Sequence, residues 1–415
     1  MRVLMVSPDE LRQPMGGLGE HVRELSKKLI EINDDLVIDI LEPTFSEPWE
    51  LIPGRVQVYG IKPTVGSVTP MHWDCYESIF RLQAVILQAL YKIPNKPDLI
   101  HAQDWSMSDA VRIFRDEQDV PLVTTIHLGL EDMVVYDASR SHYYYPKAMR
   151  AMQDMQNSII ENSNAVCHVS QHYAKRFGST MCADRETIIG NGIDLSPWMQ
   201  PLDRPFEFPG KRPKKLVYIG RFAIMKNIHS LLNAKLPDDV DLCIVGCEKG
   251  SDKEVREMVY AHASYRDDLH LLGPLYGTDK IRCMKSAWAG VFPSLREPFG
   301  IVGLEWMAAR RPMIASYVDG MNDFLEPGMA LRTGTTAIDI STSIHKLREF
   351  SEGEISTMTD AAWRRVQLFS WRTVAQRVLE AYDKARNRTW IERSYEKVME
   401  SCRAVSRPGV PDLTP

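Results

Sequence analysis

Two cations and two carboxylates in the second half of the chain are the residues best placed, by type and spacing, to do chemistry. Arg221 directly follows the apolar run 216–220, and Lys226 lies five residues further on. Two fixed cations at a strand end can converge on one spot and stabilise a departing diphosphate. A solvated basic loop would show the same two residues, so the neighbouring motifs must decide between these interpretations.

The two carboxylates, Glu297 and Glu305, bracket seven residues in the segment SLREPFGIVGLEWMAARRP. Pro298 stands where we expect a helix to begin after a strand, and Glu305 would lie about two turns along that helix. The amides that would then point at an anionic ligand belong to Phe299, Gly300 and Ile301. A glutamate favoured by the helix dipole, followed by an ordinary helical glutamate, is the alternative interpretation.

In the first half of the chain, a glycine cluster is the candidate for phosphate contacts. Gly16, Gly17 and Gly19 lie between a predicted first strand and a predicted first helix, where bare backbone amides can meet an anion. A flexible turn that needs positive φ angles explains these glycines equally well.

Polar residues at two further strand ends are the remaining candidates for the functional site. His127 ends the run PLVTTIH, and His101 and Asp104 lie at the end of DLIHAQDW. Because open parallel sheets bind ligands at the carboxyl ends of their strands, we expect these side chains to face a cleft. A single histidine at such a place is more often structural than catalytic, so both roles stay open for His127.

The elements that must position these residues form two sets of alternating strands and helices. Apolar runs at 3–6, 37–41, 99–102, 122–126 and 165–169 predict parallel strands, and residues 19–32 have helical spacing. The pattern restarts with runs at 216–219, 242–245, 270–272, 290–293 and 313–316. We therefore expect two doubly wound α/β domains, which also fits a length of 415 residues.

Prolines at 197, 201, 205, 209 and 213 mark the connection between the two sets, since neither a helix nor a central strand tolerates them. The sequence thus predicts a first domain over 1–197, a proline-rich linker over 198–213 and a second domain over 214–370. An amphipathic helix is expected over 371–386, followed by a disordered tail over 387–415.

Composition narrows the function classes. The formal charge of −5 and a pI near 6.2 disfavour a general nucleic-acid binder, although local basic patches are not excluded. Seven cysteines are scattered along the chain, and the spacing of Cys243 and Cys247 could suggest a metal pair. Because Cys243 lies in an apolar strand-like run and no second pair appears, we expect buried thiols, no metal site and a reducing, cytoplasmic setting. No stretch approaches the roughly 20 apolar residues of a membrane helix, so no integral membrane segment is expected.

Eight motifs, in order, resemble the glycogen and starch synthase family and its large relative, glycosyltransferase family 4. They are MGGLGEHVREL, HAQDW, TIH, VSQHYA, IGNGIDLSPW, YIGRFAIMKNI, EPFGIVGLEWMA and FSWRTVAQRVLEAY. The resemblance covers about residues 1–385 and implies a GT-B fold, in which two Rossmann-like domains face a central cleft. It also implies that the helix near Trp371 crosses back onto the first domain.

The same resemblance implies a retaining glycosyltransferase that moves a hexose, with glucose expected, from ADP-glucose or UDP-glucose without a divalent metal or another cofactor. Arg221 and Lys226 would stabilise the diphosphate, and Glu305 would hold the ribose hydroxyls. Glu297 and the amides after Pro298 would bind the transferred sugar, which His127 would contact from the opposite side of the cleft. Gly16 and Gly17 would contact the phosphates. The nucleotide base would contact groups near Gly246 and Leu275.

The acceptor is the open part of this interpretation. An α-glucan is the leading expectation, and a lipid, a small metabolite or a hydroxylated base in DNA are the alternatives. The sequence departs from the family at Pro14, where glycogen synthases carry a lysine, and at Gln103, where a histidine is expected. Asp104 and Tyr136 are the acceptor-side candidates, and packing explains the tyrosines at 136 and 143–145 equally well.

Two other function classes share the expected fold. A sugar- or nucleotide-binding protein without turnover is one, and the presence of both cations and both glutamates argues against it. A Rossmann dehydrogenase is the other. It ranks last because the glycine cluster lacks a full G-x-G-x-x-G, and because only Glu42 offers a ribose-binding acid after the second strand.

Overall fold

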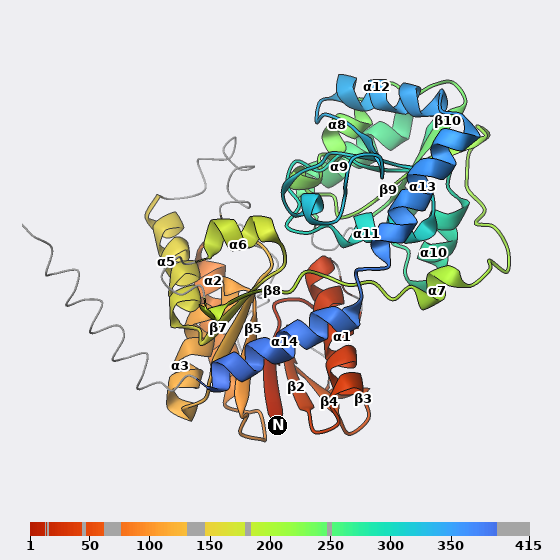
Figure 1. Cartoon of the computed structure of the whole chain (residues 1–415). Helices are drawn as coiled ribbons and strands as arrows, with labels where there is room; N and C mark the ends of the chain where they lie inside the picture. The colour runs from red at the N-terminus through yellow and green to blue at the C-terminus, as the bar shows by residue number, and fades with distance from the viewer. Residues whose placement is uncertain are drawn as a thin grey trace, which may run out of the picture.

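The computed structural model describes residues 1–12, 14, 16–43, 47–61, 76–130, 146–178, 184–246 and 251–387. These residues form two α/β domains, each built on its own sheet. In Figure 1 the first domain is red to yellow-green with one blue helix lying across it, and the second is green to blue. Helices cover both faces of both sheets, so the prediction of two doubly wound domains is confirmed.

The first sheet has the strand order β3-β4-β2-β1-β5-β6-β7-β8. All neighbours are parallel except β3 and β4, which pair antiparallel. The strands are β1 (Arg2–Val6), β2 (Val37–Glu42), β3 (Trp49–Ile52), β4 (Val56–Gly60), β5 (Leu99–Gln103), β6 (Leu122–Ile126), β7 (Ala165–His168) and β8 (Glu186–Ile188). The sequence did not predict β3, β4 and β8, which lie toward the two sheet edges and lack a continuous apolar run.

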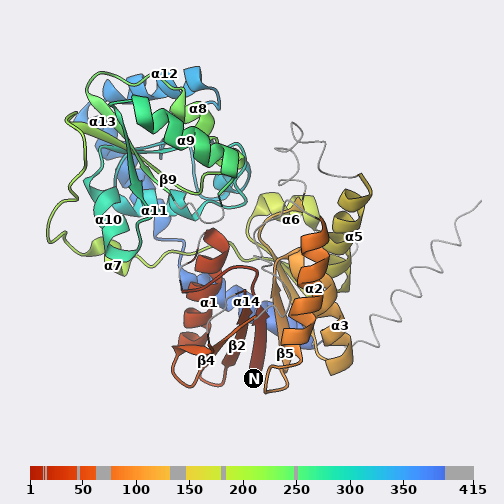
Figure 2. The same ribbon diagram turned by 180° about the vertical axis from the view of Figure 1, so that it is seen from behind.

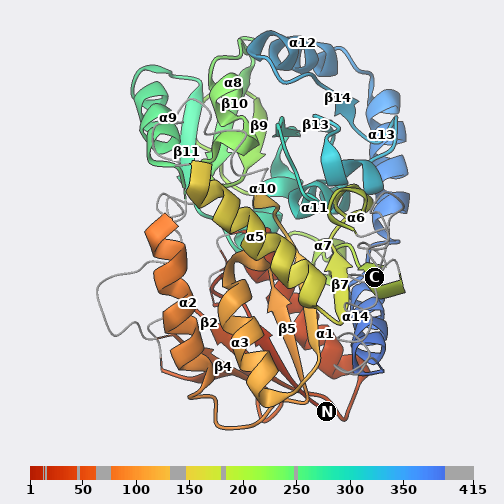
Figure 3. The same cartoon turned by 90° about the vertical axis from the view of Figure 1, so that its left-hand side faces the viewer.

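The side chains of β1 point alternately to the two faces of the first sheet, so they pack into two separate hydrophobic cores. Leu4 and Val6 pack under one set of helices, and Val3 and Met5 pack under the other. The first set lies side by side in Figure 3 and comprises α2 (Tyr76–Leu90), α3 (Ser108–Gln118) and α5 (Pro146–Asn162). The second set comprises α1 (Gly17–Ile32) and α14 (Trp371–Arg386).

The second sheet is entirely parallel, with the order β11-β10-β9-β12-β13-β14. Its strands are β9 (Lys214–Ile219), β10 (Val240–Val245), β11 (Leu269–Gly273), β12 (Ala289–Phe292), β13 (Met313–Ala315) and β14 (Leu331–Arg332). One face carries α8 (Ile228–Leu232), α9 (Lys253–Tyr265) and α12 (Ala337–Arg348). The other face carries α10 (Gly277–Ser286), α11 (Ile301–Ala309) and α13 (Glu352–Val366).

The chain passes between the domains twice. After α6 (Gln171–Phe177) and the short α7 (Ser196–Met199), residues 200–213 contain no helix or strand. The return is made by α14, which lies across the first domain in Figure 1 and packs against α1. Gly192 permits this return, because a Cβ there would come 2.3 Å from the backbone nitrogen of Trp371. The crossing helix therefore forms as the resemblance implied.

Within the described parts of the chain, no helix has both the length and the apolar character to span a bilayer.

Candidate active site

The carboxyl ends of the two parallel sheets meet at a cleft between the domains. Its larger part is a cavity of about 550 Å³, and an adjoining cavity of about 170 Å³ shares Gly16, Gly17, Arg221, Lys226 and Glu297 with it. Figure 2 shows α1 of the first domain directed at the second domain across this boundary. Both glycines thus face the second domain from the start of that helix.

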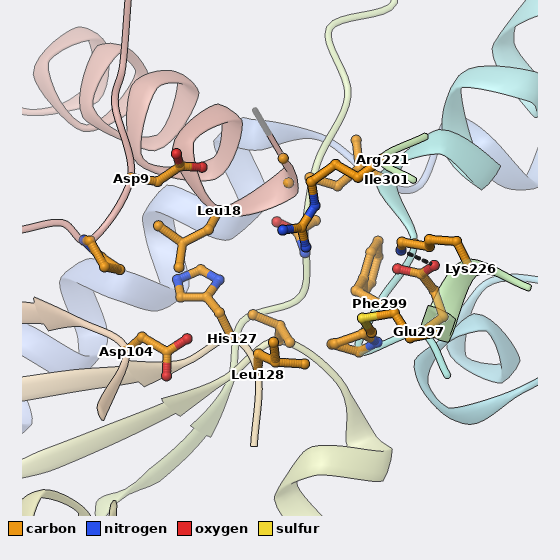
Figure 4. Close-up of a pocket in the computed structure, with 18 residues that line it drawn as sticks. Asp9, Leu18, Asp104, His127, Leu128, Arg221, Lys226, Glu297, Phe299 and Ile301 are labelled. Carbon is orange, nitrogen blue, oxygen red and sulfur yellow. Dashed lines mark hydrogen bonds and ion pairs between the residues drawn. The ribbon is translucent and has the colours of Figure 1, made fainter. Parts of the chain in front are cut away.

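Lys226 and Glu297 form the ion pair at the centre of the second domain's wall. Lys226 Nζ lies 2.6 Å from Glu297 Oε2, and the Ser294 hydroxyl donates to the same oxygen at 3.3 Å. The carboxylate is buried and the ammonium is only partly exposed. Figure 4 shows this pair beside Arg221, which follows β9 and extends into the cleft. Both cations line the two cavities of the cleft.

The helix that follows Glu297 begins later than the sequence indicated. Pro298 was expected to start it, but α11 begins at Ile301, and Gly300 before it has a φ of 100°. This left-handed conformation cannot continue a helix, and a Cβ at Gly300 would lie 2.9 Å from Glu297 Cγ. The Phe299 ring is buried in the domain core, so only its backbone is available to a ligand.

Glu305 lies about one turn into α11, not the expected two turns, and it pairs with Lys280 of α10. The distance from Lys280 Nζ to Glu305 Oε1 is 2.5 Å. Burial is the largest single effect and lowers the Lys280 pKa, but the charge and hydrogen bond of Glu305, together with the charge of Glu20, raise the pKa overall. Both residues line the larger cavity together with Gly246 and Leu275. No sequence motif would have identified Lys280.

Gly246 directly follows β10 at the same edge of the second sheet. A Cβ there would lie 2.0 Å from the Phe222 ring, so the position requires glycine and leaves its backbone open to the cleft.

On the first domain, the glycine loop packs against the second domain's cation. A Cβ at Gly16 would lie 3.6 Å from Arg221 Nε. Asp9 anchors the loop from behind, since its Oδ2 accepts from the Gly19 amide at 3.1 Å. Burial raises the Asp9 pKa, although the Arg221 charge opposes that shift. Asp9 was missed by the sequence analysis, yet its place just after β1 is the signal that could have identified it.

His127 faces the cleft as a buried, neutral ring. Its Nε2 lies 2.9 Å from Gln103 Oε1, so the ring donates to the residue that replaces the expected histidine. The His21 ring packs edge-on against it with centroids 4.7 Å apart. Burial, followed by the nearby histidines, lowers the His127 pKa well below its ordinary value. His21 itself donates from Nδ1 to Asn191 Oδ1 at 2.6 Å.

Asp104 lies beside His127 in the smaller cavity with a strained backbone. Its φ of 97° is rare for a residue with a side chain, and the Trp105 amide donates to its carboxylate at 2.7 Å. Burial raises the pKa of Asp104 to about 7, against the amides of Trp105 and Leu128. Tyr136, the other acceptor-side candidate, and the tyrosines at 143–145 lie outside the described residues.

The structure gathers most of the predicted residues at one place. His101 is the exception: it was expected to face the cleft, but it is fully buried, with its Nδ1 2.9 Å from the Tyr382 hydroxyl and its Nε2 2.7 Å from Thr125 Oγ1. The smaller cavity is lined by Gly16, Gly17, Asp104, His127, Arg221, Lys226, Glu297, Phe299, Gly300 and Ile301, and the larger one adds Gly246 and Glu305. The arrangement offers cations for a diphosphate, acids for hydroxyl groups and a neutral histidine opposite them.

Comparison with known proteins agrees with this geometry. Residues 15–197 match the family model for Glycosyltransferase Family 4, and residues 200–352 match the model for Glycosyl transferases group 1. Glycogen synthase from Mycobacterium tuberculosis is 25% identical over 410 residues, which cover 92% of this chain and 94% of that protein.

Two solved structures show the same fold. Sucrose-phosphate synthase from Thermosynechococcus elongatus superposes with a TM-score of 0.74 at 19% identity, covering 92% of this chain and 98% of that one. The Anabaena protein HepE in complex with UDP-glucose gives a TM-score of 0.68 at 19% identity, covering 92% and 99%. The expected GT-B fold is therefore confirmed.

Proposed function

The chain is a GT-B glycosyltransferase with a family 4 domain followed by a group 1 domain, and we propose that it transfers glucose from a nucleotide diphosphate sugar with retention of configuration. The observation that carries this proposal is the Lys226–Glu297 pair beside Arg221, opposite a neutral His127. The similarity to glycogen synthase over 92% of this chain supports an α-glucan as the proposed acceptor.

In the proposed reaction, the bond between the anomeric carbon and the diphosphate oxygen breaks while the acceptor oxygen bonds to the same carbon. The acceptor attacks from the face that the diphosphate leaves, and the acceptor's proton passes to the departing phosphate oxygen. Arg221 and Lys226 stabilise the negative charge that grows on the diphosphate. These two cations take the role that a divalent metal has in other transferases, so we propose metal-independent transfer.

The remaining residues bind the two substrates in this proposal. Glu297 and the backbone of residues 299–301 contact the transferred sugar, and Glu305 accepts hydrogen bonds from the ribose. UDP-glucose is the first donor to test because HepE binds it in a similar fold. Asp104 accepts a hydrogen bond from the acceptor, since its carboxylate lies at the cavity's first-domain wall.

The test is nucleotide release from UDP-glucose and ADP-glucose, with and without glycogen, in buffers with and without EDTA. We expect release to rise with added glycogen, to be insensitive to EDTA, and to yield a product with an α-linkage by NMR. Turnover of neither donor would refute the proposed donor chemistry. Donor turnover that ignores glycogen would refute only the acceptor, and lipid, small-metabolite and hydroxylated-DNA acceptors would then be screened.

A further inference from the structure

Asp319 holds the loop that carries Glu297, although it lies outside the cleft lining. It begins η5 (Asp319–Asp323) with a φ of 45°, and its side chain is 6% exposed. This left-handed backbone conformation is strained for a residue with a side chain, and it persists only where surrounding contacts hold the residue in place. Its carboxylate makes such contacts on several sides.

The carboxylate fixes the backbone on which Glu297 stands. Asp319 Oδ2 accepts from the Glu297 amide at 3.0 Å, and Oδ1 accepts from Arg296 Nη1 at 3.1 Å. The next amide, that of Gly320, donates to the Glu297 carbonyl at 3.0 Å. A Cβ at Gly320 would lie 1.9 Å from the Pro298 carbonyl oxygen, so η5 packs directly against the loop.

A histidine of the first domain also lies close to the Asp319 carboxylate. His172 Nε2, on α6 of the first domain, lies 3.6 Å from Asp319 Oδ1. Beside it, the Gln171 amide donates to Asp323 Oδ2 at 2.6 Å. Figure 3 shows α6 at the boundary between the domains, where it contacts η5 of the second domain.

We propose that Asp319 is a positioning residue that ties Glu297 to the first domain through His172. One carboxylate group receives the Glu297 amide through one oxygen and faces the first-domain histidine with the other. Approach of the first domain, which brings the acceptor, therefore sets the backbone position of the residue that contacts the transferred sugar. This inference rests on the proposed function.

The first test is Asp319→Gly, because glycine relieves the strained φ while removing the carboxylate. We expect kcat for transfer to fall between about 10- and 100-fold, as for a misaligned reacting group. The affinity for UDP, measured by calorimetry, should stay within about twofold because UDP binding uses other residues. Asp119→Gly is the matched control, since Asp119 has a φ of 52° and lies at the exposed end of α3. It should leave kcat unchanged.

The second test is His172→Ala, with His345→Ala on the exposed side of α12 as its control. We expect kcat to fall several-fold with unchanged UDP affinity, and His172→Gln, which can donate to the same carboxylate, to restore it. A folded Asp319→Gly variant with wild-type kcat would overturn the inference while leaving the proposed function intact. Equal losses of kcat in His172→Ala and His345→Ala would do the same. Wild-type protein that turns over neither donor would instead overturn the proposed function, and the inference with it.

Discussion

The two walls of the cleft hold their polar groups in different ways. The second domain presents ion pairs, Lys226 with Glu297 and Lys280 with Glu305, at 2.6 and 2.5 Å. The first domain presents His127, whose pKa is lowered well below its ordinary value, and Asp104, whose pKa is raised to about 7. Desolvation is the largest cause of both shifts, and each favours the uncharged form.

The difference follows from what each wall is proposed to meet. A departing diphosphate gains negative charge, and fixed cations stabilise such charge without reorganising. An acceptor hydroxyl and a sugar ring are neutral, so groups that hydrogen-bond without a full charge are sufficient there. We therefore propose that the donor wall works by charge and the acceptor wall by hydrogen bonding, and four experiments test that division.

Lys226→Ala should have the largest effect, because it removes a cation from the donor wall and leaves the Glu297 carboxylate without its partner. We expect nucleotide release to slow by about 10²- to 10³-fold. Lys214→Ala is the control, since Lys214 pairs with Asp239 in the same domain at 2.5 Å but lies outside the cleft lining. A folded Lys226→Ala variant with wild-type turnover would contradict the proposal that the donor wall stabilises the diphosphate by its charge.

Glu305→Gln should come next and act on donor binding. Loss of the charge-assisted hydrogen bond to ribose should raise the donor KM about tenfold, with kcat changed little. Steady-state kinetics with varied UDP-glucose measures both constants, and Glu352→Gln in the exposed first turn of α13 serves as the control. Equal losses in kcat and kcat/KM would mean that Glu305 acts in the transition state.

Asp104→Asn tests the acceptor wall through pH. The raised pKa of about 7 means that the carboxyl group is protonated below neutrality and ionises above it. Because a carboxylate is the stronger acceptor, the acceptor KM should fall about fivefold between about pH 6 and about pH 8. Asp104→Asn should flatten this dependence, and a variant that keeps the wild-type profile would assign the ionisation to another group.

His21→Gln should have no more than a modest effect on turnover but should change acid stability. Burial lowers the His21 pKa from 6.5 to about 4, so the folded ring stays neutral while the unfolded ring takes up a proton. Its contribution to stability is complete above pH 6.5 and is lost as the pH falls toward 4.

Urea unfolding at about pH 7 and about pH 5 measures that loss. The wild type should lose on the order of 2 kcal/mol more than His21→Gln between these conditions. His345→Gln, on an exposed helix face, should behave as the wild type. Identical losses in wild type and His21→Gln would show that the buried ring does not govern the acid response of this wall.

Much of the site followed from one rule, that parallel strands place their following residues at a shared edge. Arg221, Asp104 and His127 each come just after a strand, and the structure brings all three to one cavity. Lys280 could not be found in this way, because it lies within α10 and reaches Glu305 only through tertiary packing.

Local propensity also misled at one place. Pro298 is a good first residue of a helix, but the left-handed Gly300 delays α11 to Ile301. Glycine can adopt either a right-handed or a left-handed conformation, so the sequence alone does not predict the one at Gly300. Tertiary hydrogen bonds also hold this loop, from the Glu297 amide to Asp319 and from the Gly320 amide to the Glu297 carbonyl.

The helix α14 makes the first domain discontinuous along the chain. Its Trp371, Val374 and Val378 fill the core against α1 and β1, and Trp371 also packs edge-on against His21 with ring centroids 5.4 Å apart. During synthesis, residues 371–386 leave the ribosome only after the whole second domain. The core face beneath α14 thus stays open until then, so the domain that begins folding first is completed last.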